Sequence, residues 1–302
     1  MKKYILTLLI SGLIFPSLFA QEEKEPDTPV SNPFESGILI DAQTTVIPDA
    51  KTLEFIIQHK FGSVENGSSD LWGIYGSSNI RVGLNYVPVK NFQIGAGITK
   101  KNMITDLSAK WTILKQTERS TIPVSVALFG SVGIDGRAFE DLGGLGYTVD
   151  SKAAYTNPES FSFNDRLSYF SQLIVGRKVC SALSVQVGAS FTHYNMVDWY
   201  YDHDVIGLHA NARVKFSPQG SIIATYDHPL KVKGITEQHN WDTWAEPSLS
   251  FGVEFFTFTH AFQIFVSSTD KILPMEMMAH NISPIKGKSF AIGFTITRLW
   301  MF

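Results

Sequence analysis

The sequence has no long uninterrupted run of apolar residues after its first twenty positions, although 44% of its 302 residues are hydrophobic. It has a single cysteine, Cys180, which excludes an internal disulfide. Charged residues make up only 18%, against about 25% in an average soluble protein. The formal net charge of −3 gives no basic surplus, so no nucleic-acid partner is expected. The abundant apolar residues are therefore spread along the chain in short patterns.

The first twenty residues read as a secretory signal peptide. Lys2 and Lys3 supply the positive start, residues 4–15 a short apolar core, and residues 18–20 a cleavage site. The core is too short for a membrane-spanning helix. We therefore expect residues 1–20 to be removed and the chain to be exported.

Residues 21–50 differ in composition from both the signal and the rest of the chain. Their first half is acidic and proline-rich, which is typical of a disordered periplasmic segment. The part from Phe34 to Ile47 is more apolar. We expect this part to tuck against or into whatever follows, as a possible plug.

From Lys51 to Phe302 the dominant period is two residues. In the closing stretch SFAIGFTITRLWMF, large apolar side chains at Phe290, Ile292 and Phe294 alternate with small or polar ones. A two-residue period indicates β-strands with one apolar face. The predicted strands have the length that a tilted membrane strand needs, about 9–11 residues or slightly more. They are 52–61, 79–88, 91–100, 103–114, 121–134, 163–178, 182–194, 204–216, 220–229, 247–258, 260–269 and 288–302.

The connections alternate between long and short along the chain, with one exception near residues 100–102. Short turns at one end and long loops at the other are typical of outer-membrane barrels. A soluble sandwich has the same strand period but buries its apolar faces between two sheets. The signal peptide, the alternating loops and the terminal aromatic Phe302 favour the membrane. We predict an all-β fold: a closed antiparallel transmembrane β-barrel of about twelve strands over residues 51–302.

Several stretches carry a resemblance to a known family. KTLEFIIQHKFGSVENG, SNIRVGLNY, DRLSYFSQLIVGRKV, HAFQIFVSS and SFAIGFTITRLWMF together resemble an uncharacterised family of Gram-negative outer-membrane β-barrels, a domain of unknown function. The resemblance runs from about Ile40 to Phe302. It implies a β-barrel integral to the bacterial outer membrane and brings no catalytic or binding residues with it.

The inward face of the predicted barrel carries charges of both signs. Buried charge is costly unless it is paired or hydrated. The interior is therefore either filled by an ion-paired network or open as a narrow, water-filled channel. We expect Glu54 and Arg81, on adjacent strands, to pair, and Asp106 and Lys110 to share one face of a strand. The predicted lumen-lining charges are Glu54, Arg81, Asp106, Lys110, Arg166, Arg213, Lys215 and Glu254.

The long loops contain histidines, acids and aromatic residues, but no arrangement that predicts catalysis. The stretch HYNMVDWYYDHD, from His193 to Asp204, matches no metal-binding spacing, and the chain lacks a G-x-S-x-G motif. We therefore predict no enzyme activity, no metal and no cofactor. The loop aromatics are candidates for surface recognition of a glycan or protein. They are Trp199, Tyr200, Tyr201, Trp241 and Trp244.

The sequence thus predicts an outer-membrane barrel that acts as a narrow channel or transport barrel for small solutes. The alternative is an occluded barrel that serves as a surface-exposed binding or structural protein through its outer loops. The expected partners are outer-membrane lipid and the barrel assembly machinery, which reads C-terminal strands such as the one ending at Phe302.

Overall fold

The computed structural model describes most of the chain that follows the predicted signal peptide. The described residues are 27–31, 33–142, 146–148, 161–198, 201–235, 244–286 and 289–302. The predicted signal peptide, residues 1–20, lies outside this part of the chain.

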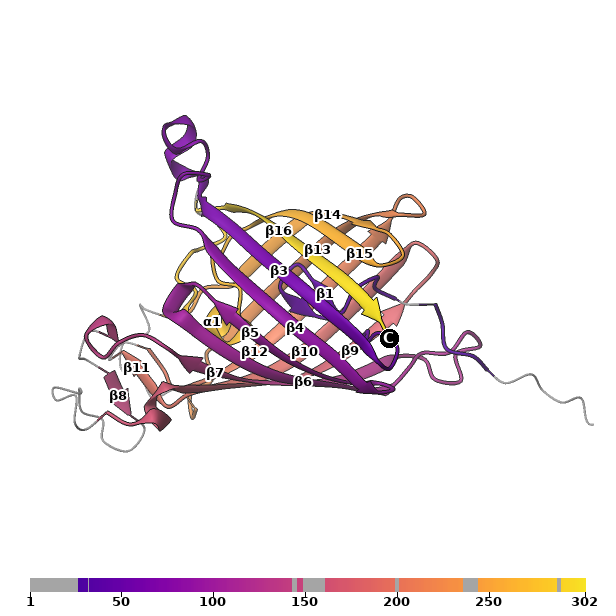
Figure 1. Cartoon of the computed structure of the whole chain (residues 1–302), viewed down its shortest axis with the longest axis horizontal. Coiled ribbons are helices and arrows are strands. Elements are labelled where there is room, and N and C mark those ends of the chain that lie inside the picture. Colours follow the sequence, from indigo (N-terminus) through magenta and orange to yellow (C-terminus); the bar gives the residue numbers. More distant parts are fainter. Residues whose placement is uncertain are drawn as a thin grey trace, which may run out of the picture.

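Twelve antiparallel strands form one closed barrel, as the sequence predicts (Figure 1). The last strand pairs with the first, from Ala291↔Ser63 to Met301↔Thr52, so no strand edge is left free. Closure satisfies every ladder position of a sheet that lipid surrounds. The wall strands are β3 (Thr52–Ser63), β4 (Asn79–Val89), β5 (Phe92–Thr99), β6 (Ile104–Leu114), β7 (Ser125–Asp135), β9 (Leu167–Lys178), β10 (Leu183–Tyr194), β12 (Asp204–Lys215), β13 (Gly220–Leu230), β14 (Ser248–Phe256), β15 (His260–Ser267) and β16 (Ala291–Met301).

Two predicted strands begin four residues later than expected. Residues Phe163–Arg166 form the 3₁₀ helix η5, which starts with a capping box between Ser162 and Asp165, so β9 begins only at Leu167. The strand expected from residue 121 begins at Ser125. In both cases local hydrogen bonds compete with the strand ladder, which is the usual behaviour of Ser, Thr and Asp side chains.

The barrel has a turn end and a loop end. The turn end holds the connections 90–91, 115–124, 179–182, 216–219 and 257–259 together with the start of β3 and the finish of β16. The loop end holds most of the longer connections together with the short η2 (Lys101–Met103), and it includes the small pair β8 (Gly146–Thr148) with β11 (Met196–Asp198). In barrels of this kind the turn end faces the periplasm and the loop end faces outward.

The apolar stripes face out of the barrel. Ile98, Leu107 and Trp111 are more than half exposed on the isolated chain, whereas Thr295 on the inner face has no exposed surface. A further feature of this surface is Arg298, whose guanidinium lies 4.9 Å from the centre of the Trp300 ring near the turn end. Among the described residues, no helix combines the length and apolar character that crossing a membrane requires.

Two segments that are not part of the wall fill the interior (Figure 1). The inner segment, residues 33–48, enters and leaves at the turn end and contains the strand pair β1 (Ile38–Leu39) and β2 (Ala42–Gln43). The inner loop, residues 268–286, folds in from the loop end and contains helix α1 (Pro274–His280). A twelve-stranded barrel is wider than its own side chains can fill, and here additional chain occupies the space.

Candidate functional site in the barrel interior

The inner segment is a hairpin held in the lumen without pairing to the wall. β1 and β2 pair only with each other in the described sheets, at Ile38↔Gln43 and Leu39↔Ala42. Its tip residue Ile40 is fully buried and has a φ of 59°, which a β-branched residue rarely adopts. The surrounding contacts must therefore hold this conformation in place.

The tip is bound by side chains of three wall strands. The Ile40 amide donates to Gln263 Oε1 at 2.5 Å, and Thr295 Oγ1 donates to the Ile40 carbonyl at 3.0 Å. Lys60 Nζ lies 2.6 Å from Asp41 Oδ2. Both charged side chains are almost completely buried, more so than those of the Glu35–Arg213 ion pair.

The body of the hairpin is held in the same way by polar wall side chains. Lys110 Nζ donates to the Gly37 carbonyl at 3.0 Å and to Gln43 Oε1 at 3.2 Å. Gln186 Nε2 donates to the Gln43 carbonyl at 2.6 Å. The attachment therefore rests on wall side chains that reach hairpin carbonyls and amides.

The start of the inner segment carries a second carboxylate. Glu35 Oε1 accepts from Arg213 Nη2 at 2.7 Å and lies 3.5 Å from Lys215 Nζ. Arg213 also donates through Nε to Glu254 Oε2 at 2.9 Å. Charge-assisted hydrogen bonds of this kind are stronger than neutral ones.

Lys60 connects the two fillings of the barrel. Besides Asp41 of the inner segment, its ammonium donates to Ser267 Oγ at 3.2 Å and to the Lys271 carbonyl of the inner loop at 2.6 Å. An ammonium group has three donors, and all three are used here. The hairpin tip and the inner loop therefore meet through one side chain.

The inner loop covers the opposite end of the lumen. Asp270 forms an ion pair with Lys101, and Glu276 Oε1 accepts from Asn102 Nδ2 at 2.8 Å. Met275 and Met278 of α1 have no exposed surface and belong to an apolar cluster shared with the wall. The remaining members of that cluster are Ile104, Ala127, Phe129, Phe170, Ile174, Val205, Leu273, Met277 and Ala279.

The predicted pairing of Glu54 with Arg81 is wrong. Arg81 instead forms two bonds with Asp106, at 2.9 and 2.6 Å, and also donates to Gln58. Glu54 accepts from Asn85 and Gln93. The strand register explains the difference, because Arg81 stands opposite Gln58 and not opposite Glu54.

Most of the predicted lumen charges are buried inside the barrel, and two are not. Lys215 is half-buried near the turn end. Arg166 lies outside the wall strand, in η5 at the loop end, where Nη1 donates to the Asp135 and Arg137 carbonyls. The predicted charges that are buried inside the barrel are Glu54, Arg81, Asp106, Lys110, Arg213 and Glu254.

No sequence pattern indicates a buried hydrogen-bond chain that crosses four neighbouring strands, β10, β12, β13 and β14. His209 Nε2 lies 2.7 Å from Ser190 Oγ, and His209 Nδ1 lies 2.6 Å from Asp227 Oδ1. The far oxygen of Asp227 accepts from Ser248 Oγ at 3.2 Å. Because the members come from separate strands, only the register reveals the chain, and no local spacing in the sequence marks it.

The predicted recognition aromatics are only partly within the described residues, because Trp199, Tyr200 and Trp241 lie outside them. Tyr201 stacks edge-on against His280 of α1, with ring centres 4.9 Å apart. Trp244 packs against the apolar cluster of the inner loop. The two described members therefore pack against the inner loop.

Cavities lie both inside the barrel and on its outer face. A space of about 20 Å³, enough for about one water molecule, lies between the two fillings beside Asp41, Arg81 and Ile272. A larger space of about 320 Å³ opens at the turn end beside Glu35 and Lys115. Large side chains such as Ile40, Ile272 and Met275 are almost completely buried in the interior.

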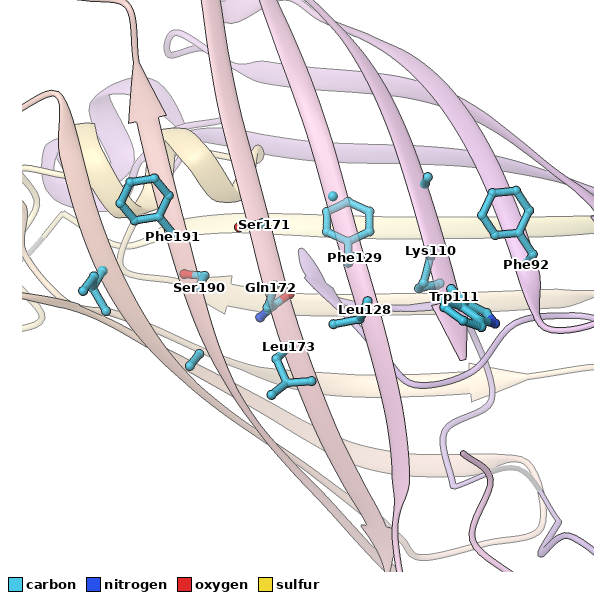
Figure 2. Close-up of a pocket in the computed structure, with 14 residues that line it drawn as sticks. Phe92, Lys110, Trp111, Leu128, Phe129, Ser171, Gln172, Leu173, Ser190 and Phe191 are labelled. Carbon is cyan, nitrogen blue, oxygen red and sulfur yellow. The ribbon is translucent and has the colours of Figure 1, made fainter. Parts of the chain in front are cut away.

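The third cavity, of about 600 Å³, is a groove on the outer face of the wall. Figure 2 shows Phe92, Trp111, Leu128, Leu173 and Phe191, which come from successive strands around it. The β7–β9 ladder runs unbroken beneath the groove. The groove is therefore a feature of the lipid-facing surface and makes no opening into the lumen.

A closed antiparallel barrel with apolar side chains outside and paired charges inside defines an integral membrane barrel of the bacterial outer membrane. The profile of one family, described as a membrane bound beta barrel domain (DUF5777), matches residues 34–300. The chain belongs to this family.

Comparison with solved structures finds outer-membrane barrels of low identity. The NanC porin is 7% identical, with 82% of this chain and 100% of that chain covered and a TM-score of 0.45. An outer-membrane channel from Pseudomonas putida F1 is 10% identical, with 84% and 97% covered and a TM-score of 0.45. Outer membrane phospholipase A from Escherichia coli is 11% identical, with 82% and 90% covered and a TM-score of 0.38. A search of curated proteins found no match.

Proposed function

We propose that the protein is an outer-membrane channel for small solutes whose lumen is closed, in the conformation described, by the inner segment. The observation that carries the proposal is the way this segment is held. It pairs with no wall strand and is fixed by side-chain bonds from β3, β6, β10, β12, β15 and β16. The segment can therefore leave without breaking any hydrogen bond of the barrel ladder.

The chemistry of the wall supports the same proposal. Once the inner segment is displaced, the buried side chains that bind its carbonyls and amides, such as Lys110 and Gln186, face the lumen. A lumen lined by ammonium, guanidinium, amide and carboxylate groups holds water and polar solutes. The role of residues 33–48 as a plug, and the processing of residues 1–20 as a signal, are parts of this proposal.

Planar-bilayer conductance tests the proposal. The full chain is expected to conduct rarely, and a variant lacking residues 27–48 to conduct steadily. A synthetic peptide of residues 27–48, added on the turn side, should restore closure. A second variant also replaces residues 271–286 with a short Gly-Ser linker, because the inner loop covers the other end. Silence in both deletion variants, with the barrel shown to be folded, would rule out a channel.

The packed interior favours a second candidate, an occluded barrel with a structural or surface-binding role. Phe34, Ile40, Met275 and Met278 are fully buried between the two fillings and the wall. The conductance experiment separates the candidates. A stable barrel that stays silent without either filling supports the occluded barrel.

We assign the chain no enzymatic role. The Ser190–His209–Asp227 chain has the order of groups found in serine hydrolases. However, Ser190 Oγ and the sulfur of Met278 lie together beside Gly207, under α1. We infer that the hydrogen-bond chain from Ser190 to Asp227 has a structural role. Covalent labelling of Ser190 by a fluorophosphonate probe would contradict this inference.

The partners we propose are outer-membrane lipid and the barrel assembly machinery. β16 ends at Met301, just after Trp300, and is followed by Phe302, which is exposed. Removal of Phe302 is expected to slow assembly in cells, seen as less folded barrel in the outer membrane. Unchanged assembly would exclude Phe302 as the signal.

A further inference from the structure

All the charged side chains of the inner segment are acidic. This indicates which class of solute the opened lumen would bind. Residues 33–48 contain Glu35 and Asp41 and no lysine, arginine or histidine. Both carboxylates are directed at wall cations: Asp41 at Lys60, and Glu35 at Arg213 and Lys215. The inner segment therefore binds the cationic side chains of the wall through two carboxylate groups.

The wall cations fall into two groups according to where their partners come from. Arg81 and Arg213 pair with carboxylates of other wall strands, two strands along the barrel: Asp106 and Glu254. Within the described part of the chain, the ion pairs of Lys60 and Lys215 are made only with the inner segment. When the segment leaves, these two ammonium groups lose their counter-charges.

Lys110 also loses hydrogen-bond acceptors when the inner segment leaves. The residue is 2% exposed. Its ammonium donates to the Gly37 carbonyl and to the Gln43 side chain, and both acceptors depart with the segment. Both hydrogen bonds are lost when the segment leaves, while Glu54 of the wall stays close enough to act on the Lys110 charge. An incoming solute with carboxylate oxygens would replace the lost bonds.

We propose that the solutes of this channel are small carboxylates, which bind at Lys60 and Lys215 where Asp41 and Glu35 stand in the closed state. This inference rests on the proposed function, because it takes the inner segment as the displaceable occupant of the lumen. The segment is then a competitor of the solute, and carboxylates favour the open state by taking over its cationic partners.

The first test measures ion selectivity in the full chain. Openings of the full-length protein and of full-length E35Q/D41N, whose segment is held less tightly, are recorded in a potassium chloride gradient. Chloride is expected to be favoured over potassium by about fivefold, the factor that corresponds to one unit charge at about 4 Å in water. The same chain with K60Q/K215Q should lose this preference, and K233Q, an exposed loop lysine, should keep it. Openings that favour potassium overturn the proposal.

The second test does not depend on conductance. The variant A42C, in a C180S background, places a thiol on the buried hairpin, and its rate of modification by a maleimide reports displacement of the inner segment. Citrate is the probe carboxylate, with potassium chloride of equal ionic strength as the control. Citrate is expected to raise the rate severalfold, and K60Q/K215Q to abolish the difference.

The outcomes separate the two proposals. Equal rates in citrate and chloride overturn the carboxylate proposal, even if the channel conducts. If citrate raises the modification rate but the deletion variants do not conduct, the barrel binds carboxylates and the channel proposal alone is rejected.

Discussion

At the scale of single residues, the buried ion pair between Asp41 and Lys60 joins the inner segment to the wall. Removing one partner of a buried ion pair costs about 3–5 kcal/mol, because the other charge stays buried. We expect Asp41→Asn to destabilise the folded barrel by about 3 kcal/mol, since Lys60 keeps two neutral acceptors. Denaturant unfolding in detergent measures this change.

The matched control is Asp49→Asn, an exposed acid just past the same segment. Its substitution is expected to cost less than about 0.5 kcal/mol, as surface changes usually do. Equal effects of the two substitutions would mean that the Asp41–Lys60 pair contributes nothing specific.

Residue parity predicts the face of a strand but not the partner across it. The sequence places Glu54, Arg81 and Asp106 on the inner face, and the structure has them there. The predicted Glu54–Arg81 pair fails because pairing depends on the register between neighbouring strands. Register follows from turn geometry and packing, which a residue count does not contain.

At the scale of elements, apolar residues on the inner face of the wall mark where a filling packs. Phe170 and Ile174 break the alternation of β9, and both lie in the cluster formed with α1. The sequence shows this irregularity without revealing its cause. The cause is the inner loop, which lies far away in the chain and folds back into the lumen.

The substitution Ile174→Ala tests this packing. Ile174 has no exposed surface, so its truncation leaves a cavity under the inner loop and is expected to cost about 2–5 kcal/mol. Its neighbour Leu173 faces outward and is 45% exposed on the isolated chain. Leu173→Ala should cost clearly less in a detergent unfolding assay. Equal costs would show that α1 does not pack tightly on β9.

The chain just before the inner segment is anchored at the turn end. Val30 donates to the Gln116 carbonyl at 2.9 Å, and Asp27 accepts from the Arg119 and Thr121 amides at 2.8 and 3.2 Å. Although desolvation acts to raise the pKa of Asp27, hydrogen bonds from Thr117, Arg119 and Thr121 lower it from 3.8 to about 2. Because the folded pKa is depressed, the anchor is fully stabilised above pH 3.8 and weakens as the pH falls toward 2.

Hydrogen exchange at the Val30 amide tests the anchor. Protection is expected to be constant from neutral pH to about pH 4 and to fall between 3.8 and 2. Asp27→Asn, compared at each pH to cancel the intrinsic exchange rate, should remove this dependence. Protection that is the same in both chains at pH 3 and pH 6 would contradict the role of Asp27.

At the scale of the whole molecule, the barrel was predictable and its filling was predictable only in part. The strand period, the loop alternation and the closing strand each repeat along the chain, so the sequence indicates twelve strands and an apolar outside. The filling depends on two segments that fold back into the lumen, one before the first wall strand and one before the last. Only the apolar composition of residues 34–47 gave a local signal for either of them.

The closed ladder predicts that the wall forms without its inner segment. Every wall strand keeps both neighbours when residues 27–48 are deleted, because none of them pairs with β1 or β2. The deletion variant is therefore expected to retain the β-sheet circular dichroism and heat-dependent gel migration of the full chain. It should unfold at lower denaturant concentration, because the buried surfaces of Phe34, Leu39 and Ile40 no longer contribute. Loss of the folded gel band would show instead that the inner segment is needed to form the barrel.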